Sequence, residues 1–291
     1  MAHTMAHTTI ANKTRRLISS GPKVCHPRLK GSKGQCLSSE HLSKLGSAMG
    51  APANLKGKTL RHWMTRRTRC KTERCWLEKA PLDKAEKTEI IERNFRPTMP
   101  DSWLENPDEW LDSTNIDSVI KQYEEVYPHF KFFGSLPIDF SAPNPYKEGS
   151  LERKECLEDA VCKLNLNELK KSGKTKLGFV YNLDPSDKGG SHWIASFTDI
   201  PGHKSYYFDS YGMKAPPQIA RFLRSLTLQD PKMKLMYNAR RFQYGDTECG
   251  VYCLHFLIRM LEGDDFKAFC RRAPRDSDMK KLRNGLFSKK E

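Results

Sequence analysis

Cys249 lies where a polar turn meets a long apolar segment. The turn QYGDTE runs directly into Cys249, and the apolar residues that follow predict a helix beginning at this point. The dipole and the free N–H groups of a helix N-terminus favour a thiolate over a thiol. A cysteine-dependent acyl transfer also needs a base, a group that orients the base, and donors for the oxyanion. Cys249 is therefore the candidate nucleophile.

Candidates for the remaining roles precede Cys249 in the chain. His192 in KGGSHWIASF stands at the start of an expected strand and is the candidate base. Asp209 in YYFDSYG ends another apolar strand, a position from which a carboxylate can orient an imidazole. The amide of Gln243 and the N–H of Cys249 are candidate oxyanion donors. Gly250 would let another backbone or a substrate come close.

Each of these residues, taken singly, has a plainer explanation. A buried cysteine is more often inert packing, and a histidine beside a tryptophan is more often a core residue. An aspartate at the end of a strand usually serves the turn. The chain order His, Asp, Gln, Cys, with each residue at the end of an element, favours the catalytic interpretation.

Alternating apolar segments and turn residues predict the elements that would position these side chains. Strands are expected over residues 130–140, 174–183, 191–200, 204–212 and 233–243. Helices are expected over residues 116–127, 156–171, 216–226 and 250–261. Helices that bracket adjacent strands indicate an α+β fold with a central mixed β-sheet flanked by helices.

The same segments resemble a known family. GGSHWIASF, YYFDSYG and Q-x5-CG resemble the adenain/Ulp1-type cysteine proteases, which include SUMO-deconjugating enzymes and viral maturation proteases. EWLDSTNIDSVIKQYE is similar to the helix start that follows Trp-Leu in that family, although Asp112-Ser113 replaces the usual Asn-Asp. FFGSLPIDF is similar to a segment of members from large DNA viruses. The resemblance covers about residues 100–291.

The resemblance implies the same catalytic roles and adds a substrate site. It implies that Cys249 is the nucleophile and that His192 is the base, which later acts as an acid. It also implies that Asp209 orients the imidazole and that the amide of Gln243 binds the oxyanion. Two tryptophans would close a narrow tunnel that admits Gly-Gly and rejects larger residues. The expected substrate-binding residues are Trp193, Trp110 and Gly250.

The expected function is a cysteine endopeptidase that cleaves after Gly-Gly in viral structural polyproteins or core proteins during virion maturation. Such an enzyme would act in the virion core and in the host cytoplasm, at the viral factory. It would need no cofactor and no metal. Two alternatives stay open: an isopeptidase for SUMO or ubiquitin-like proteins, and a virion nucleic-acid-binding protein in which the protease fold is incidental.

The basic residues are concentrated in the first third of the chain. Residues 1–90 contain 19 Lys and Arg against 6 Asp and Glu, whereas the rest contains 31 against 29. We expect residues 1–100 to form a basic arm or helical subdomain, disordered in parts, and residues 101–291 to form the catalytic domain. RHWMTRRTRCK interleaves basic and aromatic residues and suits DNA or another polyanion, although a solvated basic face is the plainer explanation. The residues concerned are Arg61, Arg66, Arg67, Arg69 and Lys71.

Other patterns exclude some classes of protein. No apolar segment approaches the roughly 18 residues that cross a bilayer, so no membrane span is expected. The N-terminus has no apolar signal-peptide core. Nine cysteines without a secretory signal predict reduced thiols. The cysteines and histidines of the N-terminal third match no zinc-binding spacing.

Overall fold

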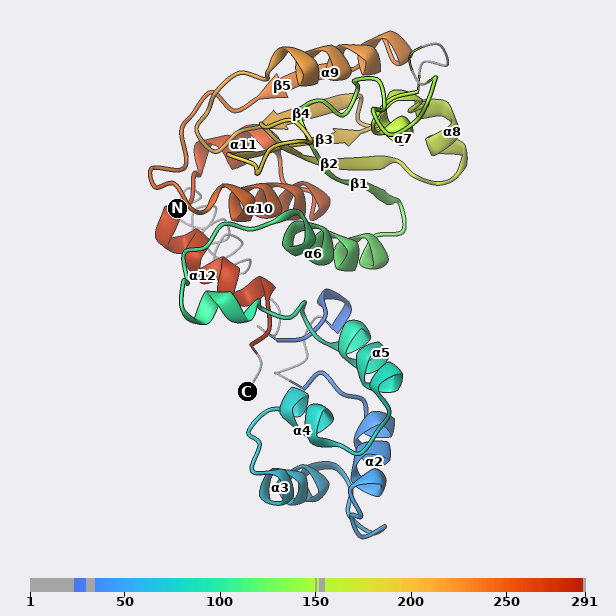
Figure 1. The fold of residues 1–291 in the computed structure, drawn as a ribbon, viewed down its shortest axis with the longest axis vertical. Helices are drawn as coiled ribbons and strands as arrows, with labels where there is room; N and C mark the ends of the chain where they lie inside the picture. The colour runs from blue at the N-terminus through green and yellow to red at the C-terminus, as the bar shows by residue number, and fades with distance from the viewer. Residues whose placement is uncertain (1–23, 30–34, 150, 152–154, 290–291) are drawn as a thin grey trace, which may run out of the picture. The chain divides into compact units, whose positions relative to one another are not determined.

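The computed structural model describes residues 24–29, 35–149, 151 and 155–289 (Figure 1). These residues form two compact units. The sheet unit runs from Asp108 to Lys280. The N-terminal unit contains the described residues up to Pro107 together with those from Lys281 onward. Residues 281–289 thus group with the N-terminal unit, whereas the sequence suggested one domain from residue 101 to the end.

The sheet unit is built on a five-stranded mixed sheet, as the sequence predicts. Its strands follow chain order and are β1 (Phe130–Leu136), β2 (Lys176–Asn182), β3 (Trp193–Asp199), β4 (Lys204–Phe208) and β5 (Lys234–Tyr237). The central pairs β2–β3 and β3–β4 are antiparallel, and the outer pairs β1–β2 and β4–β5 are parallel. The predicted strand centres were correct, but the predicted segments extended into the flanking turns.

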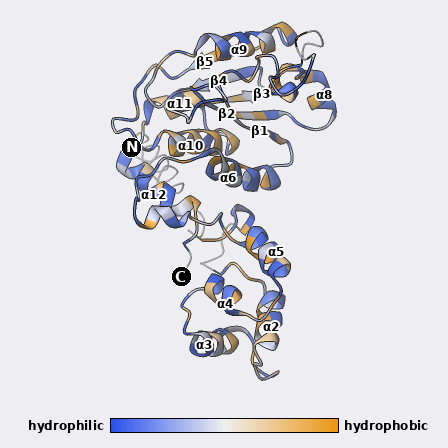
Figure 2. Cartoon of the chain, in the orientation of Figure 1, coloured by the Kyte–Doolittle hydropathy of each residue, from blue (hydrophilic) through white to orange (hydrophobic). Residues whose placement is uncertain are grey.

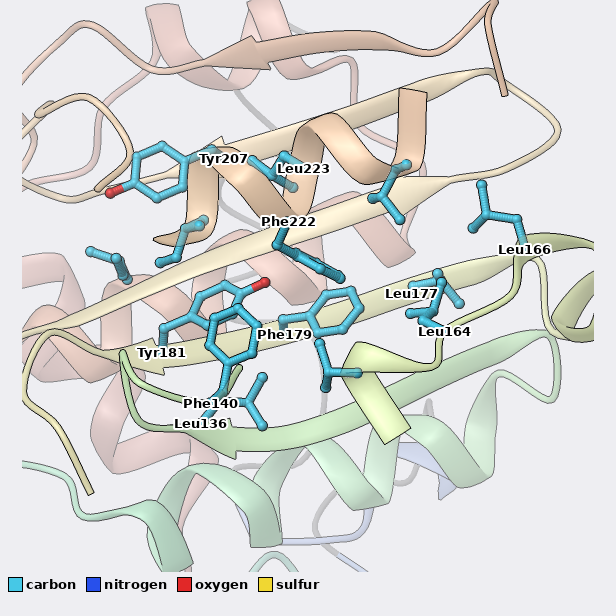
Figure 3. Close-up of a cluster of buried hydrophobic side chains, with 14 of the residues drawn as sticks. Leu136, Phe140, Leu164, Leu166, Leu177, Phe179, Tyr181, Tyr207, Phe222 and Leu223 are labelled. Atoms are coloured by element: carbon cyan, nitrogen blue, oxygen red, sulfur yellow. The ribbon is translucent and has the colours of Figure 1, made fainter. Parts of the chain in front are cut away.

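Helices cover both faces of this sheet. On one face, α9 (Pro217–Gln229) packs Phe222 and Leu223 against Phe179 and Tyr181 of β2 (Figure 3). On the other face, α10 (Cys249–Leu261) packs against β3 and α6 (Ser113–Val126) against β1. The alternation of side chains along a strand lets one strand serve both cores. Every residue of α10 is buried, which explains its mostly apolar sequence.

One predicted helix of the sheet unit is broken. Residues 156–171 form two short helices, α7 (Asp159–Cys162) and α8 (Leu166–Lys171), instead of one. The side chain of Asn165 accepts hydrogen bonds from the N–H groups of Asn167 and Glu168, so it caps α8 and ends the preceding turn. Two helices were not predicted, α11 (Phe266–Arg271) and α12 (Asp276–Leu286).

The N-terminal unit is helical and has its own core. Its α-helices are α2 (Ser39–Ala48), α3 (Gly57–Thr68), α4 (Glu73–Lys79) and α5 (Lys84–Asn94), and short 3-10 helices lie at Pro27–Leu29 and Asp101–Leu104. Buried residues such as Leu45, Met64 and Trp76 form the core. The mostly hydrophilic α5 contrasts with α10 in Figure 2. The sequence suggested a basic arm or helical subdomain over residues 1–100, and α2 to α5 lie within this range.

The prediction of reduced thiols was wrong for six cysteines. Disulfides join Cys25 to Cys36, Cys70 to Cys75, and Cys156 to Cys162. Their Cα atoms lie 5.1, 5.6 and 6.4 Å apart, within the usual range for such bonds. The partners are separated by at most 11 residues, so local turns bring them together. The number of cysteines and the missing secretory signal do not show which cysteines lie close together in the fold.

Within the described ranges, no helix is both long enough and apolar enough to span a bilayer. The same ranges contain no group of three or more His, Cys, Asp or Glu side chains that could hold a metal ion.

Candidate active site

The pairing of β3 with β4 brings His192 and Asp209 together. His192 precedes β3 and Asp209 follows β4, and the antiparallel register pairs Ala195 with Phe208. The start of one strand therefore lies beside the end of the other. His192 Nε2 lies 2.8 Å from Asp209 Oδ1, and both side chains are buried. The structure thus joins two predicted residues that are 17 positions apart.

The carboxylate of Asp209 is fixed by its surroundings. Its Oδ1 also accepts a hydrogen bond from the backbone N–H of Tyr211 at 2.9 Å, and its Oδ2 accepts one from that of Met213 at 3.2 Å. The buried Asn238 side chain pairs with the backbone of Asp209: Oδ1 accepts from Asp209 N at 2.9 Å, and Nδ2 donates to Asp209 O at 2.6 Å. These bonds hold the carboxylate in one orientation toward the imidazole.

His192 interacts with both Asp209 and Cys249. Burial by itself lowers the pKa of His192, but the hydrogen bonds to Asp209 and to Cys249 outweigh burial and raise that pKa to about 9. Because Nε2 faces Asp209, Nδ1 is the ring nitrogen available to the thiol. The ring of Tyr211 stacks on the imidazole with centroids 4.6 Å apart. The imidazole is therefore held on its edge and on one face.

Cys249 is the first residue of α10, as its place in the sequence suggests. It is 1% exposed. Gly250, which follows it, is buried, and a Cβ at that position would lie 3.0 Å from Leu111 Cβ. Absence of a side chain at Gly250 thus lets the segment before α6 approach the helix that carries the thiol. The sequence suggested that Gly250 binds substrate. In the structure, Gly250 packs against Leu111.

Gln243 lies in the loop between β5 and α10 and is fully buried. Its Oε1 accepts a hydrogen bond from Ser210 Oγ at 2.7 Å, and its Nε2 donates to Gly245 O at 2.9 Å. These two bonds define which end of the amide carries the hydrogens. A primary amide has two N–H donors, and among the described residues one of them is bonded to Gly245.

Trp110 and Trp193 line the same cavity as His192. This cavity has a volume of about 480 Å³ and extends along the Gly189-Gly190 loop. Trp193 is buried and its indole N–H donates to Leu111 O at 2.7 Å, whereas Trp110 is 43% exposed. The hydrogen bond of Trp193 anchors the segment that carries Trp110. The structure thus places both predicted tryptophans beside the candidate base.

The free cysteines other than Cys249 have different environments. Cys253 lies one turn further along α10, and complete burial raises its thiol pKa well above the usual value. Burial also raises the pKa of Cys270, to about 11. Both thiols are therefore protonated at neutral pH, which disfavours them as nucleophiles.

The basic residues expected to contact nucleic acid divide into two groups. Arg66, Arg67, Arg69 and Lys71 are exposed. Arg66 and Arg67 line a cavity of about 680 Å³ together with Trp63 on α3. Arg61, by contrast, forms an ion pair with Glu73, a buried residue whose carboxylate also accepts the N–H groups of Cys36 and Leu37. Arg61 therefore stabilises the fold of the N-terminal unit.

Sequence reasoning missed four residues of this site. Tyr211 covers the imidazole, Asn238 holds Asp209, Ser210 holds Gln243, and Leu111 holds Trp193. Tyr211 and Ser210 belong to the same DSYG segment as Asp209, so the motif could have revealed them. Asn238 is 29 positions from Asp209, and nothing in its local sequence marks it.

Comparison with known proteins identifies viral relatives. A protein of Acanthamoeba polyphaga mimivirus, which is named as a thiol protease, is 31% identical over 211 residues, covering 69% of this chain and 63% of the mimivirus protein. A cysteine protease of African swine fever virus is 25% identical over 286 residues, covering 93% of this chain and 97% of that enzyme. No family model matches the chain.

The solved structures agree with these relatives at the level of the fold. The crystal structure of the African swine fever virus protease has a TM-score of 0.67 and 22% identity, covering 93% of this chain and 97% of that one. The chain is thus similar over most of its length to viral thiol and cysteine proteases, and it has the fold of the African swine fever virus enzyme.

Proposed function

We propose that this protein is a cysteine endopeptidase that cleaves after Gly-Gly in viral structural polyproteins or core proteins during virion maturation. One observation carries the proposal: His192 Nε2 lies 2.8 Å from Asp209 Oδ1, and interaction with Cys249 is among the causes that raise the pKa of His192. Covalent acyl transfer requires a base beside the nucleophile and a third group that orients the base. The viral proteases among its relatives support the same activity.

The geometry supports the following mechanism. With a pKa of about 9, His192 is protonated at neutral pH, and an imidazolium favours the thiolate form of a cysteine beside it. The thiolate attacks the scissile carbonyl while the second N–H of Gln243 and the N–H of Cys249 bind the oxyanion. His192 then donates its proton to the leaving amine. Water, deprotonated by His192, hydrolyses the acyl-enzyme, and Asp209 holds the imidazole throughout.

The two tryptophans support the preference for Gly-Gly. Trp110 and Trp193 line one cavity with His192, and the hydrogen bond from Trp193 to Leu111 fixes one of the two indoles. A slot between two indoles admits an extended chain without side chains and excludes residues with a Cβ. The enzyme would therefore select glycine because larger residues do not fit, and not because it makes favourable contacts with glycine itself.

The proposed place of action follows from the proposed substrate. Its relatives are proteins of large DNA viruses, so we propose action in the virion core and in the host cytoplasm, at the viral factory. The N-termini of proteins in the mature particle provide the test. New N-termini that follow Gly-Gly would support the proposal, and their absence would contradict it.

Cleavage of peptides tests the reaction itself. The full chain should cut a Gly-Gly-X peptide and should cut the matched Gly-Ala-X peptide at least about 100-fold more slowly, because the added methyl group does not fit the slot. A Gly-Gly aldehyde or vinyl sulfone probe should label wild type at Cys249 and should not label Cys249→Ala. Labelling at another cysteine would contradict the assignment.

An isopeptidase is the second candidate function. Its support is the name SUMO-1 cysteine protease that the relatives from some African swine fever virus isolates carry. A linear Gly-Gly precursor and a SUMO or ubiquitin conjugate, assayed at equal concentrations, distinguish the two activities. Faster cleavage of the conjugate would favour the isopeptidase.

We also propose that the N-terminal unit binds DNA or another polyanion. The support is the exposure of Arg66 and Arg67 beside Trp63. Arg66→Glu/Arg67→Glu should weaken binding of a short DNA duplex and flatten its salt dependence. The matched control is Lys170→Glu/Lys171→Glu, an equal change of charge at two lysines on α8 in the sheet unit. Equal weakening by both variants would indicate a merely non-specific effect of charge.

A further inference from the structure

The cavity that His192 lines extends beyond the two tryptophans. Its lining continues past Trp110 and Trp193 to Leu157 and Glu158, on the segment that leads into α7. A substrate whose Gly-Gly lies beside His192, and whose preceding residues extend through this cavity, would advance by about 3.3 Å per residue. The side chains of these preceding residues would therefore meet Leu157 and Glu158.

Glu158 differs from the other acidic residues of the lining. Asp112 accepts a hydrogen bond from Asn115 N at 2.7 Å and caps α6, and Asp184 accepts one from Ser191 Oγ at 3.0 Å. The carboxylate of Glu158 has no hydrogen bond or ion pair to any described residue. Burial, the one cause of its shift, raises the pKa of this half-buried carboxyl. Glu158 is thus a partly desolvated acid without a partner of its own among the described residues.

The backbone that carries Glu158 is held in place. Its N–H donates to Phe140 O at 2.9 Å, and its carbonyl accepts from Val161 N at 3.0 Å. The disulfide between Cys156 and Cys162 closes the loop that contains it. These bonds fix the position from which the Glu158 side chain extends into the cavity lining.

We infer that Glu158 is a specificity-determining residue, and that it selects a lysine or arginine shortly before the Gly-Gly of the substrate. The inference rests on the proposed function, because it concerns the same cavity. A cationic side chain would give Glu158 the partner it lacks, and the aliphatic stem of that side chain would lie against Leu157. The lining contains one lysine among the described residues, Lys188, which is exposed and lies 4.0 Å from Asp187. It therefore leaves the charge of Glu158 uncompensated.

Peptides that differ at one position test this inference. Each peptide keeps Gly-Gly and carries Lys, Met or Glu at one of the three positions that precede it. With wild type, we expect kcat/KM for Lys to exceed that for Met by about five-fold at one position, and Glu to be cut more slowly than Met. Glu158→Gln should abolish the preference for Lys, and Glu158→Lys should reverse it. Glu168→Gln, the same change on the exposed face of α8, should leave the preference unchanged.

The outcomes separate this inference from the proposed function. Equal cleavage of the Lys, Met and Glu peptides at all three positions would overturn the inference and leave the Gly-Gly protease intact. A preference for Lys that persists in Glu158→Gln would also overturn it. If no Gly-Gly peptide is cut, the proposed function fails and the inference fails with it. Thermal unfolding at the wild-type temperature would show that each variant is folded.

Discussion

The two units differ in how their candidate functional residues are held. In the sheet unit, His192 and Asp209 are buried and bonded to each other, and further bonds fix the carboxylate. In the N-terminal unit, Arg66 and Arg67 are exposed and belong to a single helix. A buried charge needs a defined partner, whereas an exposed charge is solvated and interacts with many partners. We therefore expect the sheet unit to carry out specific chemistry and the N-terminal unit to attract polyanions.

The units also differ in their thiols. The free cysteines are found in the sheet unit, and two of the three disulfides, Cys25–Cys36 and Cys70–Cys75, are found in the N-terminal unit, counting described residues. The sheet unit has a larger apolar core, so it is stable without many covalent links. The small N-terminal unit gains stability from crosslinks of its unfolded chain.

The largest effect is expected from loss of the nucleophile. Cys249→Ser should reduce kcat/KM on a Gly-Gly peptide by about 10⁴-fold, because a serine beside an imidazolium is a poor nucleophile. Cys253→Ala, one turn further on the same helix, should change kcat/KM by less than about three-fold and cost about 1 kcal/mol of stability. Steady-state kinetics and denaturant unfolding measure the two quantities. Equal losses of activity would remove the distinction between the two thiols.

Removal of the orienting charge should have the next largest effect. Asp209→Asn should reduce kcat/KM by about 100-fold, because the imidazole loses both its orientation and its stabilising charge. Wild-type activity should fall as pH rises through about 9, where His192 loses its proton. In Asp209→Asn this decrease should occur at lower pH. A pH profile of kcat/KM checks both statements, and an unchanged upper limb would contradict the role of Asp209.

The raised pKa also affects stability. A folded-state pKa of about 9 exceeds the ordinary value of 6.5, so the folded state binds this proton more tightly than the unfolded state. The contribution of the His192 interactions is fully present below pH 6.5 and is lost as pH rises through about 9. The free energy of unfolding of His192→Ala should therefore show a weaker pH dependence between 6.5 and about 9 than that of wild type.

A smaller effect is expected from Gly250→Ala. The added Cβ would meet Leu111, and overpacking of this kind costs about 1–3 kcal/mol. Since Leu111 O accepts the indole N–H of Trp193, tryptophan fluorescence should also change. Gly285→Ala on α12 is the control, because a Cβ there meets no atom within 4 Å and alanine favours a helix. Denaturant unfolding should show destabilisation for the first variant and none for the second.

The smallest effect on catalysis is expected in the N-terminal unit. Cys70→Ser/Cys75→Ser should destabilise this unit by about 2 kcal/mol, because the disulfide no longer restricts the unfolded chain. Cleavage of a short Gly-Gly peptide should stay within about two-fold of wild type. Hydrogen exchange of α3 and α4 would report the local loss of stability. A large loss of peptide cleavage would show that the two units are functionally coupled.

Local patterns in the sequence determined much of this protein. Period-two and helical periodicities predicted all five strands of the sheet and the long helices α6, α9 and α10. The positions of His192, Asp209, Gln243 and Cys249 at the ends of elements, together with the family resemblance, selected them as candidates. Such signals are local, because a strand end or a helix start depends on a few neighbouring residues.

Tertiary structure decided which residues meet. Pairing of β3 with β4 set the distance of 2.8 Å between His192 and Asp209, and a residue 29 positions away, Asn238, fixes the carboxylate. Pairing of nearby cysteines and the ion pair of Arg61 with the buried Glu73 also depend on turns and packing that composition does not encode. Glu158 lines the cavity of His192 for the same reason. Contacts between distant segments arise from the packing of the whole chain, so only the folded structure shows them.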